Sequence, residues 1–212
     1  MRTKKDTLEI VERLKQEYPV SECTLTYEDA WQLLVGVRLA AQCTDARVNI
    51  VTEELFAKYP SLEALADAGA DAIEEIVRPC GLGRSKARDI AAMARMVLDE
   101  YGGHVPREMK DLLRLPGVGR KSANLVRGDI FGEPAVVTDT HCIRLANRIG
   151  FVTDEKDPVK VEKALWKVLP PEESNDFCHR CVMHGRAVCT ARKAMCEICC
   201  LRDICRPGRK TL

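Results

Sequence analysis

Residues 115–124 read LPGVGRKSAN, and this stretch decides the fold because it joins two segments of helical pattern through a tight turn. Gly117 and Gly119 bracket Val118, so the backbone is free to take positive φ angles while the valine anchors the turn in the core. The N–H groups of such a turn, aided by the positive end of the next helix, can point at a phosphate oxygen. A plain helix–helix turn fits the same glycines, so the short motif leaves both interpretations open.

Two basic residues follow the turn. Arg120 and Lys121 stand at the start of a second helical pattern that continues to Phe131. A solvated lysine beside a hairpin commonly contacts a phosphate, whereas an amine that has lost its proton is a nucleophile. The residues by themselves favour the phosphate contact.

A second motif centres on a carboxylate. The sequence Thr138-Asp139-Thr140-His141 precedes a helical run over residues 142–149. Aspartate directly before a helix is a preferred N-cap, because its carboxylate accepts backbone N–H groups of the first turn. Capping alone would explain Asp139, although a capping side chain is also held rigidly.

Cysteines cluster near the end of the chain. Seven of the 11 lie between Cys178 and Cys205. An odd cysteine count in a chain with no leader does not suggest a disulfide framework. Four of the seven have the spacing C-x6-C-x2-C-x5-C; they are Cys189, Cys196, Cys199 and Cys205. Four thiolates from one short segment can hold a tetrahedral zinc ion or a [4Fe–4S] cluster, and the spacing does not separate the two.

Charge is distributed unevenly although the net charge is only +1. Residues 1–106 carry 13 Lys and Arg against 18 Asp and Glu, whereas residues 107–212 carry 20 against 14. A concentrated basic surface is what phosphate binding requires, though a solvated basic tail has the same composition. Between the first two clustered cysteines, Arg192 and Lys193 would present two cations to phosphates if a metal holds the loop rigid.

Helical signals dominate the chain, and the predicted fold class is all-α. Leu8, Val11 and Leu14 form an apolar stripe over residues 4–17. Thr26 and Asp29 resemble a capping box before a helix, and Ser85 is a candidate cap for a long helix ending at Tyr101. Further helices are expected at 46–58, 71–78, 107–114, 120–131, 140–149, 158–168 and 173–187. Only residues 135–137 resemble a strand.

Taken together, these motifs resemble the endonuclease III family of helix-hairpin-helix DNA glycosylase/AP lyases. The resemblance rests on the hairpin string, on Val-x-Asp-Thr-His followed by Arg-Leu-x-Asn-Arg at 137–148, and on the cysteine loop, in that order; it covers about residues 20 to 207. It implies two α-helical lobes with DNA in the cleft between them. One would be a six-helix barrel of residues 22–133 with the helix-hairpin-helix at about 107–131. The other would combine residues 1–21 and 134–212 with the cluster loop at 189–205.

The resemblance also implies roles for individual residues. Lys121 would be the nucleophile and Asp139 the catalytic carboxylate. The four clustered cysteines would hold a [4Fe–4S] cluster. Gln42 and Leu82 match loop residues that fill the gap left by an extruded nucleotide. The expected DNA contacts are Gln42, Leu82, Gly117, Val118, Gly119, Arg120, His141, Arg192 and Lys193.

Two positions depart from the family pattern. Leu113 stands where close relatives often have an acidic residue, and Gly83 stands where an aromatic side chain often follows the Leu82 position. Neither change removes the candidate nucleophile or carboxylate, but both bear on base preference and catalytic efficiency.

The resemblance therefore implies a bifunctional DNA glycosylase/AP lyase acting on oxidised or ring-saturated pyrimidines and on abasic sites in double-stranded DNA. One alternative is a monofunctional mispair glycosylase of the same fold, and another is a non-catalytic helix-hairpin-helix module with a structural metal. No apolar run approaches the ~20 residues of a membrane span, and the charged N-terminus lacks a signal core. We expect a monomer in the cytoplasm, associated with the nucleoid if the protein is bacterial.

Overall fold

The computed structural model describes residues 2–205. The chain forms two compact units. The first, here called the central unit, is Cys23–Phe131; the second, the terminal unit, consists of Met1–Glu22 and Gly132–Leu212. The described residues form ten α-helices and no strand, only one isolated bridge between Cys189 and Ala194. The all-α prediction is confirmed for this part of the chain.

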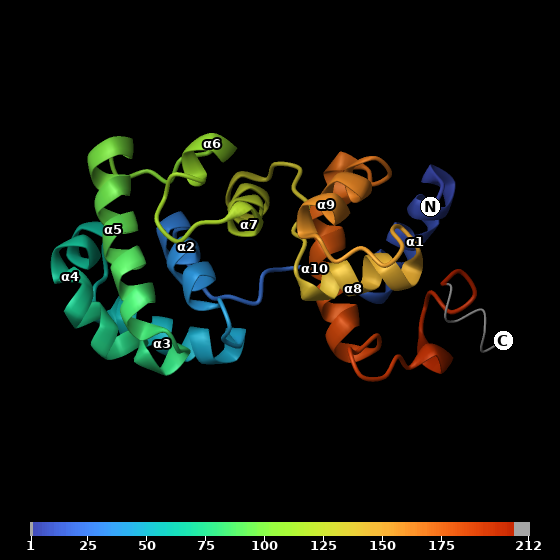
Figure 1. The fold of residues 1–212 in the computed structure, drawn as a ribbon, viewed down its shortest axis with the longest axis horizontal. Coiled ribbons are helices and arrows are strands. Elements are labelled where there is room, and N and C mark those ends of the chain that lie inside the picture. Colours follow the sequence, from blue (N-terminus) through green and yellow to red (C-terminus); the bar gives the residue numbers. More distant parts are fainter. Residues whose placement is uncertain (1, 206–212) are drawn as a thin grey trace. The chain divides into compact units, whose positions relative to one another are not determined.

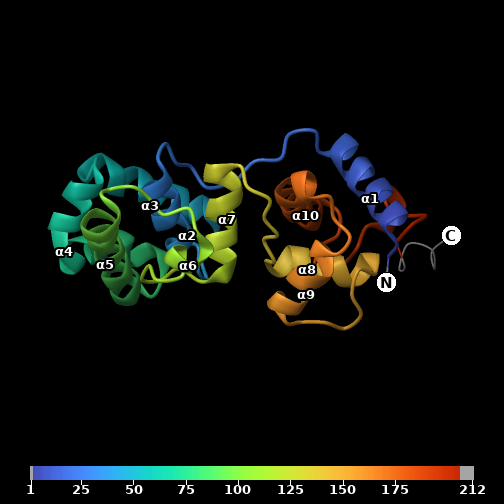
Figure 2. The ribbon, with the colours of Figure 1, turned by 90° about the horizontal axis from the view of Figure 1, so that it is seen from above.

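The central unit is a helical bundle built around α2 (Figure 1). Its elements are α2 (Ala30–Leu39), α3 (Asp45–Lys58), α4 (Leu62–Val77), the 3₁₀ turn η1 (Arg78–Cys80), α5 (Gly83–Tyr101), α6 (Met109–Leu112) and α7 (Arg120–Phe131). Helix α2 is apolar on nearly every side, so it is buried and packs against α3, α5 and α7. Helices α4 and α5 lie side by side (Figures 1 and 2).

The terminal unit combines the N-terminal helix with the helices that follow α7. Its α-helices are α1 (Lys4–Glu17), α8 (Thr140–Ile149), α9 (Pro158–Trp166) and α10 (Ser174–Ala187), with 3₁₀ turns η2 (Pro171–Glu173) and η3 (Cys196–Ile198). Helix α10 packs against both α1 and α8 (Figure 2). The N-terminal segment is therefore part of the unit that carries the cysteine loop.

Several helix boundaries agree with the sequence, and others do not. Helices α1, α7 and α8 have the expected bounds. The buried face of α1 is made by Ile10, Val11 and Leu14, whereas Leu8 is exposed. The predicted helix at 71–78 is only the second half of α4, because Gly69 (φ 74°) interrupts a longer helix capped by Ser61. The predicted helix at 107–114 is a single turn, α6.

Two predicted N-caps are wrong by a few residues. The capping box of α2 pairs Asp29 with Gln32, while the Thr26 N–H bonds to Asn49 instead. Helix α5 begins at Gly83 with Leu82 as N-cap, and Ser85 is inside the helix, where its hydroxyl accepts from Arg38. In both cases the predicted capping residue makes a tertiary contact instead, through its backbone N–H at Thr26 and through its hydroxyl at Ser85.

Residues 135–137 are extended and buried but pair with no strand in the described structure. Their N–H groups bond to side chains of α10. Ala135 donates to the hydroxyl of Ser174 at 3.1 Å, and Val137 donates to the thiol of Cys178 at 3.2 Å. Side chains thus replace the ladder partners that a strand would need.

None of the helices in residues 2–205 combines the length and the apolar character needed to cross a membrane.

Candidate functional site

The hairpin of the central unit runs from α6 to α7. Gly117 has φ 77°, the left-handed conformation that favours glycine, whereas Gly119 is not in that region. Val118 is buried and donates its N–H to the carbonyl of Leu115 at 3.1 Å. Both glycines are exposed. The turn thus presents backbone outward on either side of one buried anchor.

The hairpin rests on an ion pair between two other helices. Arg38 on α2 donates from Nε to Asp89 on α5 at 2.7 Å, and its side chain is largely buried. A Cβ atom built on Gly117 would lie 2.5 Å from Cδ of Arg38, which is closer than such atoms approach. Gly117 is therefore required both by its φ angle and by the arginine beneath it.

Replacing each hairpin glycine by alanine tests whether the φ angle and the Arg38 contact restrict Gly117 but not Gly119. We expect Gly117→Ala to lower the free energy of unfolding by about 1–3 kcal/mol, because it combines a strained φ with the Arg38 contact. Gly119→Ala meets no atom within 4 Å and should change stability little. Urea denaturation of both variants measures the difference, and equal stabilities would contradict this account of the turn.

Lys121 is the second residue of α7 and is exposed. Its neighbour Arg120, the first residue, is exposed as well. The start of a helix carries partial positive charge, and two added cations make this corner of the central unit attractive to an anion. An exposed amine at such a position can reach a bound anionic ligand.

Asp139 lies in the terminal unit as the N-cap of α8. Its Oδ1 atom accepts the N–H of Cys142 at 2.7 Å, so the predicted capping role is confirmed. The side chain is half-buried. Lys121 belongs to the central unit and Asp139 to the terminal unit.

His141 follows in the first turn of α8 and is tightly packed. Its Nδ1 atom is 3.0 Å from a guanidinium nitrogen of Arg144. A Cβ atom on Gly185 of α10 would come within 2.5 Å of the same Nδ1, so only glycine allows this approach. The imidazole is therefore held in place by α8 and α10 together.

Gln42 and Leu82 lie in two loops of the central unit that follow α2 and η1. Both are exposed, Leu82 with 58% of its surface accessible. Both also have left-handed backbones, with φ 58° for Gln42 and 51° for Leu82. Such conformations are uncommon for residues with side chains and mark loops held by their surroundings.

The two positions that depart from the family pattern, Gly83 and Leu113, differ in how closely other residues pack around them. A Cβ atom on Gly83 would come 3.0 Å from Cα of Arg78, so a larger residue there requires the backbone to shift. Leu113 is exposed at the end of α6, with 43% of its surface accessible. Close packing against Arg78 thus explains why glycine stands at position 83, and nothing in the structure explains the leucine at position 113.

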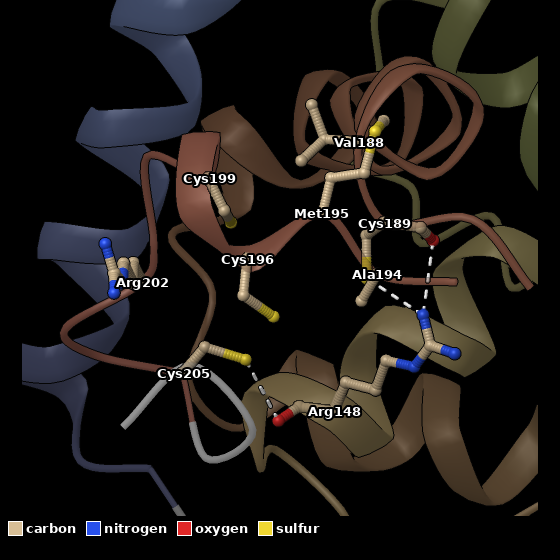
Figure 3. Close-up of a pocket in the computed structure, with 9 residues that line it drawn as sticks. All are labelled: Arg148, Val188, Cys189, Ala194, Met195, Cys196, Cys199, Arg202 and Cys205. Atoms are coloured by element: carbon tan, nitrogen blue, oxygen red, sulfur yellow. Dashed lines mark hydrogen bonds between the residues drawn. The ribbon is translucent and has the colours of Figure 1, made fainter. Parts of the chain in front are cut away.

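The four clustered cysteines line one cavity of the terminal unit (Figure 3). Cys189 follows α10, Cys196 begins η3, Cys199 directly follows η3, and Cys205 lies farther along the loop. Figure 3 shows the sulfur atoms of Cys196 and Cys205 directed into the same space. Within residues 2–205, however, no three His, Cys, Asp or Glu side chains are arranged as a ready metal site.

Hydrogen-bond donors point at two of these sulfur atoms. Arg148 donates to Sγ of Cys189 at 3.2 Å. The Leu201 N–H donates to Sγ of Cys199 at 3.4 Å, and Nε2 of His184 is 3.3 Å from the same atom. The Tyr18 hydroxyl lies 3.1 Å from Nδ1 of His184, so a proton donated there leaves Nε2 as the N–H facing the sulfur.

These donors favour thiolates, the form in which cysteine binds metal. The hydrogen bond with Cys200, ahead of those from His184 and Leu201, holds the pKa of Cys199 well below its usual range. Cys200 is thus a neighbour that supports Cys199. The donor set of four sulfurs in one cavity fits a metal or an iron–sulfur cluster.

The loop between Cys189 and Cys196 closes on itself through Thr190. Its hydroxyl donates to the carbonyl of Lys193 at 2.6 Å and accepts the N–H of the same residue at 3.1 Å. Arg192 and Lys193 are both exposed on this turn. The loop presents two cations together, as the sequence predicts.

Some residues that shape the site were not predicted from the sequence. Sequence reasoning missed the buried His184, which contacts Cys199, and the arginines Arg144 and Arg148, which bond to the carbonyl of Cys189. It also missed the role of Lys86, a fully buried lysine of α5. The four-residue spacing of the two arginines was the available signal, since it places both on one face of α8, where they can act on the same neighbouring segment.

Comparison with known proteins identifies the family. Residues 35–171 match the model of the HhH-GPD superfamily base excision DNA repair proteins. The chain is 44% identical over 203 residues to endonuclease III of Synechocystis sp., covering 95% of this chain and 92% of that protein.

Solved structures agree with this match. A trapped covalent intermediate of endonuclease III with DNA superposes with a TM-score of 0.93 at 39% identity, covering 100% of this chain and 99% of that one. A thermostable thymine-DNA glycosylase gives 0.86 at 26% identity, covering 97% and 98%. The likeness extends over both units and the whole hairpin, and the chain belongs to the endonuclease III family of HhH-GPD DNA glycosylases.

Proposed function

We propose that this protein is a bifunctional DNA glycosylase/AP lyase of base excision repair, with oxidised or ring-saturated pyrimidines and abasic sites in double-stranded DNA as substrates. The observation that carries the proposal is Lys121, an exposed amine in the first turn of the helix that follows the hairpin. Among the relatives, the proposal is supported by a solved covalent intermediate of endonuclease III with DNA, whose protein chain is 39% identical to this one.

DNA binding would begin at the hairpin. Gly117, Gly119 and Arg120 are exposed at the start of α7, and their backbone N–H groups and the arginine side chain would bind a phosphate. In the terminal unit, His141, Arg192 and Lys193 supply further contacts. These contacts hold the duplex without reading its sequence.

Catalysis requires the damaged nucleotide to leave the stack. Gln42 and Leu82 would occupy the space that it vacates, because unstacking is costly unless the gap is filled. The exposed positions of both side chains suit this role.

The chemistry then follows from one amine and one carboxylate. The unprotonated Nζ of Lys121 attacks C1′ of the deoxyribose, and the C1′–N bond breaks with its electron pair leaving on the base. Asp139 stabilises the positive charge that develops on the sugar and accepts a proton from the attacking amine. Opening of the sugar ring gives a Schiff base between Nζ and C1′. Loss of a C2′ proton then expels the 3′ phosphate by β-elimination.

Cys189, Cys196, Cys199 and Cys205 would hold a [4Fe–4S] cluster. When bound, the cluster cross-links the loop that follows α10 and so supplies structural rigidity. Residues of the loop itself and of α8 position the two cations. The turn at Thr190 displays Arg192 and Lys193, and Arg148 ties that turn to α8 through the carbonyls of Thr190 and Ala191.

The cluster assignment predicts opposite outcomes for adjacent cysteines. Cys199→Ser should lose most of the iron and sulfide, about four of each per chain in the native protein, whereas Cys200→Ser should retain them. Iron and acid-labile sulfide are measured by colorimetric assay, alongside the visible absorption of the purified proteins. Equal iron in the two variants, or zinc in place of iron in the unaltered protein, would contradict the assignment.

The proposal also covers the setting of the reaction. The protein would act as a monomer in the cytoplasm, associated with the nucleoid if it is bacterial, because its substrate is DNA.

Borohydride trapping tests the function directly. The protein is mixed with a duplex containing thymine glycol, and sodium borohydride reduces any Schiff base to a stable amine. A bifunctional enzyme gives a covalent protein–DNA adduct. A mispair glycosylase gives base release with no adduct, and a non-catalytic binding module gives neither; each of these results would refute the proposal.

A further inference from the structure

The loops that carry Gln42 and Leu82 are joined by a buried lysine. Lys86 lies in the first two turns of α5 and has none of its surface exposed. Its ammonium donates to the carbonyl of Leu39 at 2.8 Å and to the carbonyl of Cys80 at 2.8 Å. Leu39 ends α2, three residues before Gln42, and Cys80 ends η1, two residues before Leu82. One side chain therefore fixes the starting points of both loops.

The two loops also meet at a second point. The thiol of Cys43, the residue directly after Gln42, is close enough to that of Cys80 to add to the effect of burial, which raises the pKa of Cys80. Farther along the same helices, Arg38 of α2 bonds to Asp89 and Ser85 of α5. Lys86, Arg38, Ser85 and Asp89 thus form a set of polar contacts between α5 and the segments of α2 and η1 that lead into the two loops.

Burying a lysine at this position costs desolvation free energy. Burial lowers the pKa of Lys86, and an ammonium removed from water is tolerated only where acceptors replace its hydration. An apolar side chain of similar length would fill the same volume without that cost. What the ammonium supplies is simultaneous bonding to two carbonyls, one at the helix end before each loop.

The backbone of each loop shows why such a tie is needed. Gln42 and Leu82 are two of only three non-glycine residues with positive φ in residues 2–205. Each such conformation costs on the order of 1–3 kcal/mol and persists only when the surroundings impose it. Loops free of that restraint would relax toward negative φ and redirect the exposed side chains.

We propose that Lys86 is a positioning residue that holds the loops of Gln42 and Leu82 at one fixed spacing, so that both side chains enter damaged DNA together. The inference rests on the proposed roles of Gln42 and Leu82 in filling the gap in the duplex. Lys86 itself touches neither substrate nor reacting atoms. Its effect is confined to the step in which a nucleotide leaves the stack.

The test compares Lys86→Met, which keeps an unbranched side chain only one atom shorter and removes the donors, with Ile90→Val, a core change one turn farther along α5. Two affinities are measured by fluorescence anisotropy, one for an undamaged duplex and one for a duplex with a tetrahydrofuran abasic analogue. We expect Lys86→Met to lower the preference for the abasic duplex about tenfold while binding to undamaged DNA changes less than about threefold. Ile90→Val should leave the preference unchanged.

A double-mutant cycle distinguishes positioning from a general loss of structure. In the background Gln42→Ala with Leu82→Ala, the loops have no side chains to position, so Lys86→Met should have little further effect on the preference. Full additivity of the three changes would overturn the proposal, as would an equal loss of both affinities.

Lys86→Gln is the second variant, in case Lys86→Met does not fold. Its shorter amide reaches one carbonyl at most, so an intermediate loss of preference is expected, and a preference equal to that of the unaltered protein would overturn the proposal. The binding ratio needs no catalysis. Failure of the trapping experiment would therefore refute the proposed chemistry and leave this measurement intact.

Discussion

Replacing Lys121 by glutamine should abolish the covalent adduct with thymine-glycol DNA in the presence of borohydride. Glutamine is one atom shorter and keeps the polarity of the side chain, but it has no nucleophilic amine, so the Schiff base cannot form. We expect the rate of strand cleavage to fall by more than about a thousand-fold, as is typical when a covalent nucleophile is removed. Single-turnover cleavage assays and denaturing gels of the trapped product measure both effects.

The matched control removes the same charge one residue earlier. Arg120→Gln takes one cation from the start of α7 but leaves the amine of Lys121 in place. It should still be trapped, with weaker DNA affinity and a salt dependence whose log–log slope is shallower by about 0.9 for one lost phosphate contact. If Lys121→Gln were trapped as well as the unaltered protein, another amine would be the nucleophile.

Lys121→Gln must also be shown to bind DNA. The residue is exposed and the helix begins at Arg120, so the substitution leaves the hairpin packing on Val118 intact. Its affinity for the tetrahydrofuran duplex should stay within about threefold of that of the unaltered protein, since one solvated contact contributes little. A large loss of affinity would shift the interpretation from chemistry to binding.

The parts of this molecule that sequence reasoning predicted well are local ones. The hairpin between α6 and α7 is specified by ten contiguous residues, and the N-cap at Asp139 by its position before an apolar pattern. The four cysteines that line one cavity lie within a single short segment. In each case the chain neighbours supply most of the contacts that fix the geometry.

Features fixed by distant contacts could not be predicted. Lys86 bonds to a carbonyl 47 positions earlier in the chain, and the same separation joins Arg38 to Ser85. Gly117 looks like an ordinary turn glycine until Arg38 is found beneath it. A lysine in the pattern GLGRSKAR suggests a solvated or phosphate-binding side chain, because lysines are seldom fully buried. Only the fold reveals that its acceptors are two carbonyls.

The same limit explains the errors in helix boundaries. The signal for the first half of α4 was present in Ser61, Leu62 and Leu65, but Gly69 broke the periodic pattern and hid it. Ser85 has the chemistry of a cap and lies near a helix start, yet Arg38 engages its hydroxyl. Local rules name the residues that are able to cap, and tertiary packing selects among them.

The second large effect concerns Asp139, whose two roles can be separated by choice of substitution. Asparagine caps helices about as well as aspartate, so Asp139→Asn should preserve the bond to the Cys142 N–H and leave the free energy of unfolding nearly unchanged. It removes the negative charge, however, and we expect single-turnover base release to fall by about 10²- to 10⁴-fold. Urea denaturation and the excision assay are measured on the same preparation.

Asp139→Ala completes the comparison because it removes the cap as well as the charge. It should lose about 0.5–2 kcal/mol of stability, the usual contribution of an N-cap, and base release should fall about as far as in Asp139→Asn. A carboxylate that served only as a cap would give the reverse pattern, with normal excision in Asp139→Asn and a defect only in the alanine variant. Stability then follows the hydrogen bond and catalysis follows the charge, so the two measurements assign each role to a different property of one side chain.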